Sequence, residues 1–256
     1  MTVTVGVVGG GQLARMMIPA AEALGLHLAV LAEADHCSAR LAATAVGDYR
    51  DLDHLLDFAE SVDVVTFDHE HVPTELLNEL ESRGVVIRPG PHALAFAQDK
   101  ALMRGRLART SAPLPDWAVA SSTAEVEEFL AQHSGEVIAK TPRGGYDGKG
   151  VRVIRSVAEV AEWLELGEVL LEEKVEFSRE LAQLVARSPS GQMTVFPLVE
   201  TIQANGVCAE VIAPAPNASD SLSTRTAAVA KTIAEELDVT GVLAVELFQV
   251  GDDVVV

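Results

Sequence analysis

The residues best suited to chemistry lie between Lys140 and Gly150, in the stretch Lys-Thr-Pro-Arg-Gly-Gly-Tyr-Asp-Gly-Lys-Gly. A short apolar run flanks it on each side, so the pattern predicts a strand, a loop and a second strand. Its glycines can expose backbone N–H groups as an anion nest, and Lys140 and Lys149 add positive charge. These features suit a polyphosphate. A flexible surface hairpin is the alternative, and the Tyr146-Asp147 pair and the lysine at the strand end favour binding over it.

The chain around this loop divides into three predicted domains. The first, 1–90, alternates strands and helices as a doubly wound parallel α/β sheet does, and it ends at Pro89-Gly90-Pro91. A small central domain, 91–175, carries the loop, and 176–256 follows it. The predicted strands are 3–8, 27–31, 62–67, 85–88, 137–139, 151–154, 169–172, 181–186, 194–202 and 241–248. The predicted helices are 13–24, 52–60, 74–83, 99–110, one beginning at 123, and 218–238.

The turn after the first predicted strand supports a different hypothesis. Gly9-x-Gly11-x-x-Ala14 fits the dinucleotide fingerprint, and Glu33 and Asp35 follow the second strand at a suitable distance for a ribose contact. An NAD-dependent dehydrogenase is therefore an alternative. It rests on the first 35 residues only and gives the glycine-rich loop no role.

Lys140 and the loop that follows it resemble the phosphate-covering loop of ATP-grasp enzymes. Among these, the stretch is most similar to carboxyaminoimidazole ribonucleotide synthetases, and the resemblance runs from Val5 to Val256. It implies an N-terminal doubly wound domain followed by an ATP-grasp α+β fold, with 91–175 as its small central subdomain and 176–256 as the larger one, C-terminally incomplete. The Tyr146-Asp147 pair favours this family over biotin carboxylase and the formate-using glycinamide ribonucleotide enzyme.

The resemblance implies a set of nucleotide contacts. Lys100 and Lys140 would hold phosphates, the loop would cover them, and the backbone at 172–175 would contact the adenine edge, although on pattern alone an exposed acidic turn is the simpler interpretation. The implied ATP-binding residues are Lys100, Lys140, Gly145, Gly148, Gly150, Val151, Glu172, Glu173, Lys174, Val175, Glu180 and Gln203. Val151 and Gln203 depart from the family, which has Gln and often His at these points.

The resemblance also implies residues for the substrate and for catalysis. The implied substrate contacts are Gly11, Gln12, Leu13, Glu70, Tyr146 and Asp147, and the implied catalytic residues are Tyr146, Asp147 and Lys149. Glu70 lies in Thr-Phe-Asp-His-Glu-His just past a predicted strand end, where ligands of open α/β sheets bind. Asp68, His69 and His71 depart from the family's Glu-Phe-Glu-Asn.

Glu246 is the one acid in the apolar run Val-Leu-Ala-Val-Glu-Leu-Phe. A buried carboxylate is costly unless it is paired or bound to a metal, and Mg²⁺ favours carboxylate and phosphate oxygens. The resemblance implies that Glu246 is a metal ligand. Strand alternation that turns this side chain to solvent is the alternative. The expected cofactors are therefore ATP and Mg²⁺.

Composition and charge indicate which classes of partner and which cellular compartment to expect. The net charge of −19 argues against nucleic acid and anionic membranes, although nine of the 19 Lys and Arg lie between positions 100 and 155. No apolar run reaches bilayer length and no signal sequence is visible. Cys37 and Cys208 show no metal-type spacing, which favours reduced thiols in the cytoplasm. By resemblance, the complete protein is expected to be a homodimer.

The implied reaction couples ATP, bicarbonate and aminoimidazole ribonucleotide to a carboxyamino product, ADP and phosphate, in purine biosynthesis. Another ATP-grasp carboxylase, a formyl-transfer ligase and a nucleotide-binding remnant without turnover are alternatives. The remnant is considered because the family continues past Val256 into an Asn-Glu pair and a basic subdomain. Without them, weak nucleotide binding, poor turnover and an exposed apolar edge prone to aggregation are expected.

Overall fold

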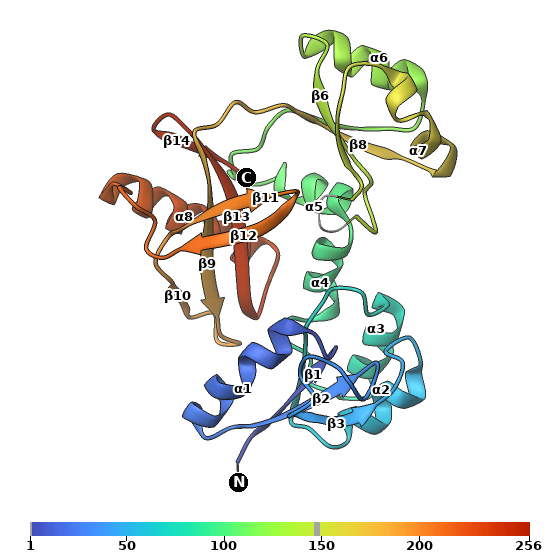
Figure 1. Cartoon of the computed structure of the whole chain (residues 1–256), viewed down its shortest axis with the longest axis vertical. Coiled ribbons are helices and arrows are strands. Elements are labelled where there is room, and N and C mark those ends of the chain that lie inside the picture. Colours follow the sequence, from blue (N-terminus) through green and yellow to red (C-terminus); the bar gives the residue numbers. More distant parts are fainter. Residues whose placement is uncertain (1, 146–148) are drawn as a thin grey trace. The chain divides into compact units, whose positions relative to one another are not determined.

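The computed structural model describes residues 2–145 and 149–256 and forms two compact units, Met1–Ala95 and Phe96–Val256 (Figure 1). Three residues predicted to belong to the site, Tyr146, Asp147 and Gly148, lie outside the described residues. The division of the second unit near position 175 stays a prediction, although each side of that point has its own sheet.

The first unit is a parallel sheet of four strands in the order β3-β2-β1-β4, with helices on it. Val7 and Val8 of β1 point to opposite faces and both are fully buried, one in each of two apolar clusters. Both faces of the sheet are therefore covered, as a doubly wound fold requires. The strands are β1 (Thr4–Val8), β2 (His27–Ala32), β3 (Ala43–Val46) and β4 (Val64–Phe67), and the helices are α1 (Gln12–Leu24), α2 (Leu52–Ala59) and α3 (Thr74–Ser82).

Two predictions for this unit were wrong. The strand β3 was missed, because Ala-Thr-Ala-Val is short and half exposed and lacks a long apolar run. The predicted strand 85–88 is reduced to a single bridge between Val65 and Ile87.

The second unit begins with two short helices, α4 (Pro91–Gln98) and α5 (Lys100–Leu107), and a four-stranded antiparallel sheet in the order β5-β8-β6-β7. The predicted helix 99–110 is shorter, because Asp99 caps α5 by accepting from Leu102 N, and α5 ends at Leu107. The strands are β5 (Trp117–Ala120), β6 (Val137–Lys140), β7 (Val151–Ile154) and β8 (Val169–Glu173). The helices over this sheet are α6 (Thr123–Gln132), the 3-10 turn η1 (Val157–Glu159) and α7 (Ala161–Leu166).

The pairing of β6 with β8 decides which side chains share a face. Ile138 lies opposite Glu172 and Lys140 lies opposite Leu170, so Lys140 and Glu172 point to the same face. The alternate residues Ala139 and Leu171 point the other way, into the apolar cluster under α6. Lys140 and Glu172 therefore share one face of the sheet, whereas Arg152, opposite Ala139, lies on the other face, where its guanidinium stacks over the Trp163 ring.

A second antiparallel sheet follows, in the order β12-β11-β9-β13-β14, with β10 also paired to β9. One predicted strand, 194–202, is two strands, because Pro197 between them has no N–H to donate. The strand β12 was missed, since all six of its residues are exposed. The elements are β9 (Arg179–Arg187), β10 (Met193–Val195), β11 (Val199–Ala204), β12 (Val207–Ile212), α8 (Asp220–Glu236), β13 (Gly241–Val250) and β14 (Asp253–Val255).

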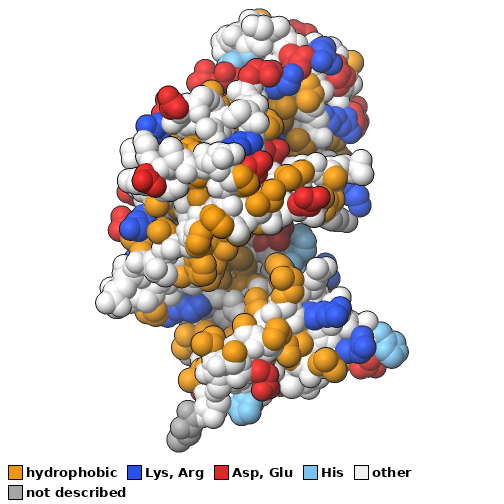
Figure 2. Space-filling model, turned by 60° about the vertical axis from the view of Figure 1, so that its left-hand side comes forward, with side chains coloured by type: hydrophobic (Ala, Val, Ile, Leu, Met, Phe, Trp, Pro, Cys, Tyr) orange, Lys and Arg blue, Asp and Glu red, His pale blue; other side chains and the backbone are white. Residues whose placement is uncertain are grey.

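The surface carries both charges. On the face shown in Figure 2, acidic and basic side chains are interspersed, and no continuous basic patch is visible among the described residues there. None of the described helices combines the length and the apolar character that crossing a bilayer needs.

The buried polar pair Gln183 and Thr226 joins α8 to β9. Thr226 Oγ1 lies 3.0 Å from Gln183 Oε1, and Gln183 Nε2 donates to Phe196 O at 2.7 Å. Thr226→Val leaves the Gln183 carbonyl buried without that donor, so we expect the free energy of unfolding to fall by about 1–3 kcal/mol in urea titrations. Thr224→Val, on the exposed side of the same helix, is the control, with an expected change within about 0.5 kcal/mol. Equal changes in the two variants would contradict this role.

Candidate functional site

A buried carboxylate, Glu172, lies at the centre of the charged face of the β5–β8 sheet. Glu172 is 4% exposed, and Arg104 Nε donates to its Oε1 at 2.5 Å. The Lys140 ammonium forms an ion pair with its other oxygen, Oε2. Burial alone would raise the pKa of Glu172, but the charges of Lys140 and Arg104 outweigh it and hold the pKa below its usual range. Glu172 is therefore ionised at neutral pH, with one cation on each oxygen.

Lys140 and Arg104 differ in their access to solvent. The Arg104 side chain is 7% exposed, and its Nη1 also donates to Val256 O at 2.9 Å. The Lys140 side chain is 23% exposed and stands at the end of β6, where the glycine-rich loop begins. Lys140 is therefore the cation of this cluster that a ligand can reach.

The base of the loop has room for glycine only. Thr141 N donates to Gly150 O at 2.9 Å, and a Cβ on Gly150, whose φ is +75°, would lie 2.3 Å from Thr141 Oγ1. A Cβ on Gly145 would lie 2.6 Å from Lys149 O. Thr141 Oγ1 is buried and has no hydrogen-bond partner among the described residues. The loop thus closes on itself at its base, and each of these glycines is a packing requirement there.

Lys100, at the start of α5, reaches the loop from outside. Its Nζ lies 3.4 Å from Gly145 O, and its backbone N donates to Pro142 O at 2.9 Å. The structure therefore brings together five of the predicted nucleotide contacts: Lys100, Lys140, Gly145, Gly150 and Glu172. Lys149 and Val151, at the far end of the loop, are exposed.

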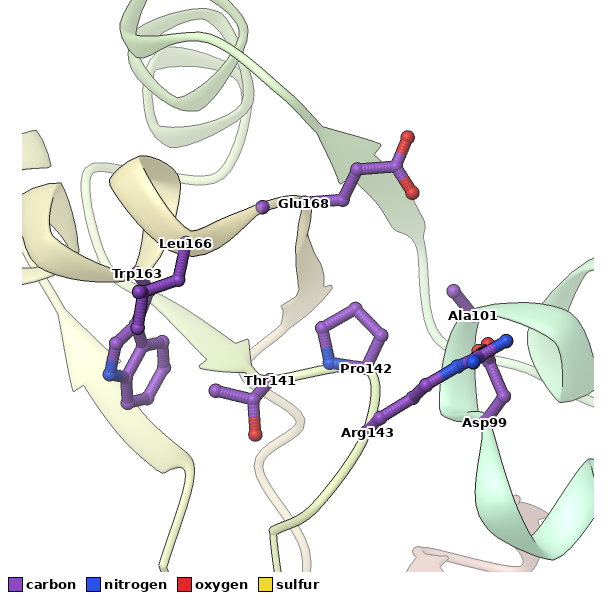
Figure 3. A pocket seen from close by; sticks show the side chains of 9 residues that line it. Asp99, Ala101, Thr141, Pro142, Arg143, Trp163, Leu166 and Glu168 are labelled. Atoms are coloured by element: carbon purple, nitrogen blue, oxygen red, sulfur yellow. Dashed lines mark hydrogen bonds and ion pairs between the residues drawn. The ribbon is translucent and has the colours of Figure 1, made fainter. Parts of the chain in front are cut away.

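A cavity of about 440 Å³ opens beside the loop base (Figure 3). Thr141, Pro142 and Arg143 border it on one side, while Trp163 and Leu166 border it from α7. Arg143 Nε donates to Asp99 at 2.7 Å across its rim. The residues that line this cavity include none of the predicted nucleotide contacts, so the charged cluster and the cavity are separate features.

Residues 172–175, at the end of β8 and just after it, turn most of their side chains away from the charged cluster. Glu173 and Lys174 are exposed, and Lys174 Nζ pairs with Glu136 at 2.5 Å. Glu173 N donates to Asp116 O at 2.8 Å. Only Glu172 of this segment is buried in the charged cluster. A ligand would therefore meet 173–175 through the backbone or through exposed side chains.

Glu180 and Glu246 share one face of the larger sheet. Glu246 pairs with Ala182, and Glu180 stands two residues along the same strand. The alternate residues of β9 and β13 are buried and α8 packs beside these strands, while Glu246 is exposed. The alternation of β13 thus turns Glu246 out of the core. No cluster of three or more possible metal ligands occurs among the described residues, and Gln203 lies exposed on β11.

In the first unit, carboxylates already occupy the turn before α1. Asp68 Oδ1 accepts from Ala14 N at 2.7 Å, and Glu33 Oε2 accepts from Gly10 N at 3.2 Å. A Cβ on Gly11 would lie 1.9 Å from Asp68 Oδ2. A dinucleotide pyrophosphate needs these N–H groups and would meet two negative charges there. The geometry therefore disfavours the dehydrogenase hypothesis.

The predicted substrate contacts of the first unit lie around this turn and the segment that follows β4. Gln12 and Leu13 are exposed at the start of α1, and Gly11 is half-buried before them. Glu70 is half-buried two residues after the capping Asp68.

Two charged residues of these clusters were not singled out as site residues. Arg104 is one of the nine Lys and Arg between positions 100 and 155, and its spacing of four from Lys100 places both on one side of a helix. Asp68 was noted only as a departure from a motif. Its contact with Ala14 spans 54 positions, and no local sequence signal predicts such a pairing.

Comparison with known proteins gives a consistent result. A family model described as ATP-grasp domain matches residues 106–256, and one described as ribonucleotide synthetase preATP-grasp domain matches residues 1–98. An N5-carboxyaminoimidazole ribonucleotide synthase of Mycobacterium bovis is 47% identical over 97% of this chain. The chain spans 59% of the length of that relative.

Solved structures of the same family superpose on nearly the whole chain. An ADP complex of an N5-carboxyaminoimidazole ribonucleotide synthetase superposes with a TM-score of 0.89 at 33% identity, covering 100% of this chain and 69% of the other. The enzyme of Aspergillus clavatus, in complex with ADP and 5-aminoimidazole ribonucleotide, gives a TM-score of 0.88 at 28% identity, covering 99% and 68%.

The depressed pKa of Glu172 predicts a pH dependence of stability. A carboxyl group whose folded pKa lies below its ordinary value of 4.5 stabilises the fold above that value, and the stabilisation is lost as the pH falls through the folded pKa. We expect Glu172→Gln to lower the free energy of unfolding by about 3 kcal/mol at pH 7, since it leaves two cations without their carboxylate. Urea unfolding of both proteins at pH 7 and at a series of pH values below 4.5 measures the difference, which should shrink with acidity. A constant difference would show that the carboxylate charge is not the stabilising feature.

Proposed function

Because this chain belongs to the N5-carboxyaminoimidazole ribonucleotide synthase family of ATP-grasp proteins, we propose that it binds ATP and uses it to carboxylate aminoimidazole ribonucleotide with bicarbonate. The observation that carries the proposal is the position of Lys140, at the mouth of a loop whose base glycines leave no room for a Cβ. Such a loop can bring backbone N–H groups close to phosphate oxygens, with a lysine as a point charge beside them.

The residues of the second unit fit a nucleotide. Lys140, at the end of β6, and Lys100, whose Nζ lies 3.4 Å from Gly145 O, supply positive charge near the loop base. Thr141 contributes a buried hydroxyl without a partner among the described residues. When bound, ATP supplies the phosphoryl group that activates bicarbonate, a poor electrophile by itself. The chain's own residues position the reactants and neutralise charge. We assign the adenine edge to the backbone at 172–175 and the ribose to Glu180.

Other roles follow from the same proposal. Gly145 to Val151 would cover the phosphates, with Lys149 beside them and Gln203 near the nucleotide. We assign contacts with the ribonucleotide to Gly11, Gln12, Leu13, Glu70, Tyr146 and Asp147. We assign catalysis to Tyr146, Asp147 and Lys149.

We propose Mg²⁺ as the metal and Glu246 as its ligand. Mg²⁺ is commonly held by one or two carboxylates plus substrate phosphates, so exposed Glu246 fits this donor set without a larger protein cage. When bound, the metal would neutralise phosphate charge. A homodimer in the cytoplasm completes the proposal. The net charge of −19 supports the further expectation that the protein binds neither nucleic acid nor anionic membranes.

Nucleotide binding can be tested with two substitutions on one hairpin. Lys140→Ala removes the reachable cation while Arg104 remains to neutralise Glu172, so we expect the Kd for Mg-ATP, measured by calorimetry, to rise by roughly tenfold or more. Arg152→Ala is the control, because Arg152 pairs with Glu162 at 2.5 Å and stacks over Trp163 at 4.1 Å. Its Kd should stay close to that of the parent. Similar losses of affinity in both variants would indicate that the positive charges between positions 100 and 155 act only through their summed field and not through a specific contact of Lys140. Binding of NAD without binding of ATP or ADP would overturn the proposal.

The reaction itself is tested by ADP release in the presence of bicarbonate and Mg-ATP, with and without aminoimidazole ribonucleotide. We expect release to depend on the ribonucleotide, because bicarbonate activation is productive only when an amine receives the carboxyl group. Release that is independent of the ribonucleotide would indicate another ATP-grasp carboxylase. Binding of ATP with no release under any of these conditions would support a nucleotide-binding protein without turnover.

A further inference from the structure

Arg104 is the one cation of the Glu172 cluster that a ligand cannot reach. Its side chain is 7% exposed, its Nε is bonded to Glu172 and its Nη1 to Val256 O. It nevertheless shares the Glu172 carboxylate with Lys140, the residue to which the proposed function assigns phosphate. Any movement of Lys140 toward a phosphate must therefore change the environment of Glu172.

The charges of the cluster decide the cost of that movement. Glu172, Arg104 and Lys140 together carry one net positive charge at neutral pH, since two cations face one carboxylate. When the Lys140 ammonium leaves Glu172 for a phosphate, the carboxylate keeps Arg104 at 2.5 Å and remains neutralised. Without Arg104, the same movement would leave a carboxylate that is 4% exposed with no counter-ion, which is strongly unfavourable.

We propose that Arg104 is a positioning residue that releases Lys140 for phosphate binding by neutralising Glu172 in its place. The proposal rests on the nucleotide site proposed above. Arg104 touches no ligand in this scheme. Its effect is exerted through the carboxylate it shares with Lys140, so it should depend on the presence of charge at both positions 104 and 172.

A purely structural role for Arg104 is the competing explanation, because its bond to Val256 O also ties α5 to the backbone that follows β14. The two explanations differ in what happens when Glu172 is neutralised as well. Arg104→Gln and the double variant Arg104→Gln/Glu172→Gln both lose the arginine and its bond to Val256. Only the double variant removes the negative charge that would retain Lys140.

Calorimetric titration with ADP compares five proteins. We expect Arg104→Gln to raise the Kd by roughly tenfold, Arg104→Lys to stay within about threefold of the parent, and the double variant to recover most of the loss. Arg106→Gln is the matched control in the same helix, since Arg106 pairs with Glu236 at the exposed end of α8. Circular dichroism melting of each protein shows that it is folded at the assay temperature. A double variant as weak as Arg104→Gln, or Arg104→Gln equal to the parent, would overturn the proposal.

A measurement without nucleotide separates this inference from the proposed function. Acylation of Lys140 by a small amine-reactive ester, followed by peptide mass spectrometry, reports how firmly Glu172 holds the ammonium. With Glu172 bound to Lys140 alone, we expect Arg104→Gln to slow acylation at Lys140 by roughly threefold or more, and the double variant to restore it. Failure of the parent to bind ADP would refute the nucleotide site while these acylation rates still report on Arg104. Equal rates in all three proteins would refute the role of Arg104 itself.

Discussion

The second unit depends on one buried charge, the carboxylate of Glu172. It lies in β8, between β5 and β6, and its two oxygens are bonded to α5 through Arg104 and to the end of β6 through Lys140. A carboxylate in this position is tolerated only with close counter-ions, so the packing of α5 on the sheet and the position of Lys140 are linked. The Arg104 side chain is buried and the Lys140 side chain is partly exposed. The net positive charge of the cluster is therefore accessible at Lys140, where the glycine-rich loop begins.

The two glycine-rich turns of the chain illustrate how neighbouring charge decides what a backbone nest can hold. The turn before α1 has the glycines and the helix N-terminus of an anion site, yet Asp68 and Glu33 accept from its N–H groups. The loop after β6 instead has Lys100 and Lys140 beside it. Two similar glycine-rich turns therefore have neighbours of opposite charge, carboxylates at the first and lysines at the second. The first is filled by the chain's own carboxylates, and the second is suited to an incoming anion.

The larger sheet contributes an exposed face with few positive charges. Its core side is packed through Gln183, Thr226 and the apolar residues between β9 and α8, and its other face carries Glu180 and Glu246. Glu246 is exposed and Glu180 is half-buried, so both carboxylates keep contact with solvent and neither needs a buried counter-ion. The smaller sheet thus has two cations around its one buried carboxylate, whereas this face of the larger sheet carries carboxylates.

Local pattern determined much of this protein. Apolar periodicity predicted α1, α2, α3 and α8 to within two residues at each end, and the start of α6, because helices are specified by neighbours three and four positions apart. The residues around Lys140 also predicted two strands joined by a loop, and β6 and β7 pair there as expected, while the phosphate role of the loop stays a prediction. The sequence analysis did not predict the strand β12 or the break at Pro197. All six residues of β12 are exposed, so its sequence shows no alternation of buried and exposed positions. Only the tertiary structure decided that Arg104 lies on Glu172, 68 positions away, and that Asp68 closes the turn before α1. Such contacts depend on strand register and helix packing, which no stretch of sequence contains by itself.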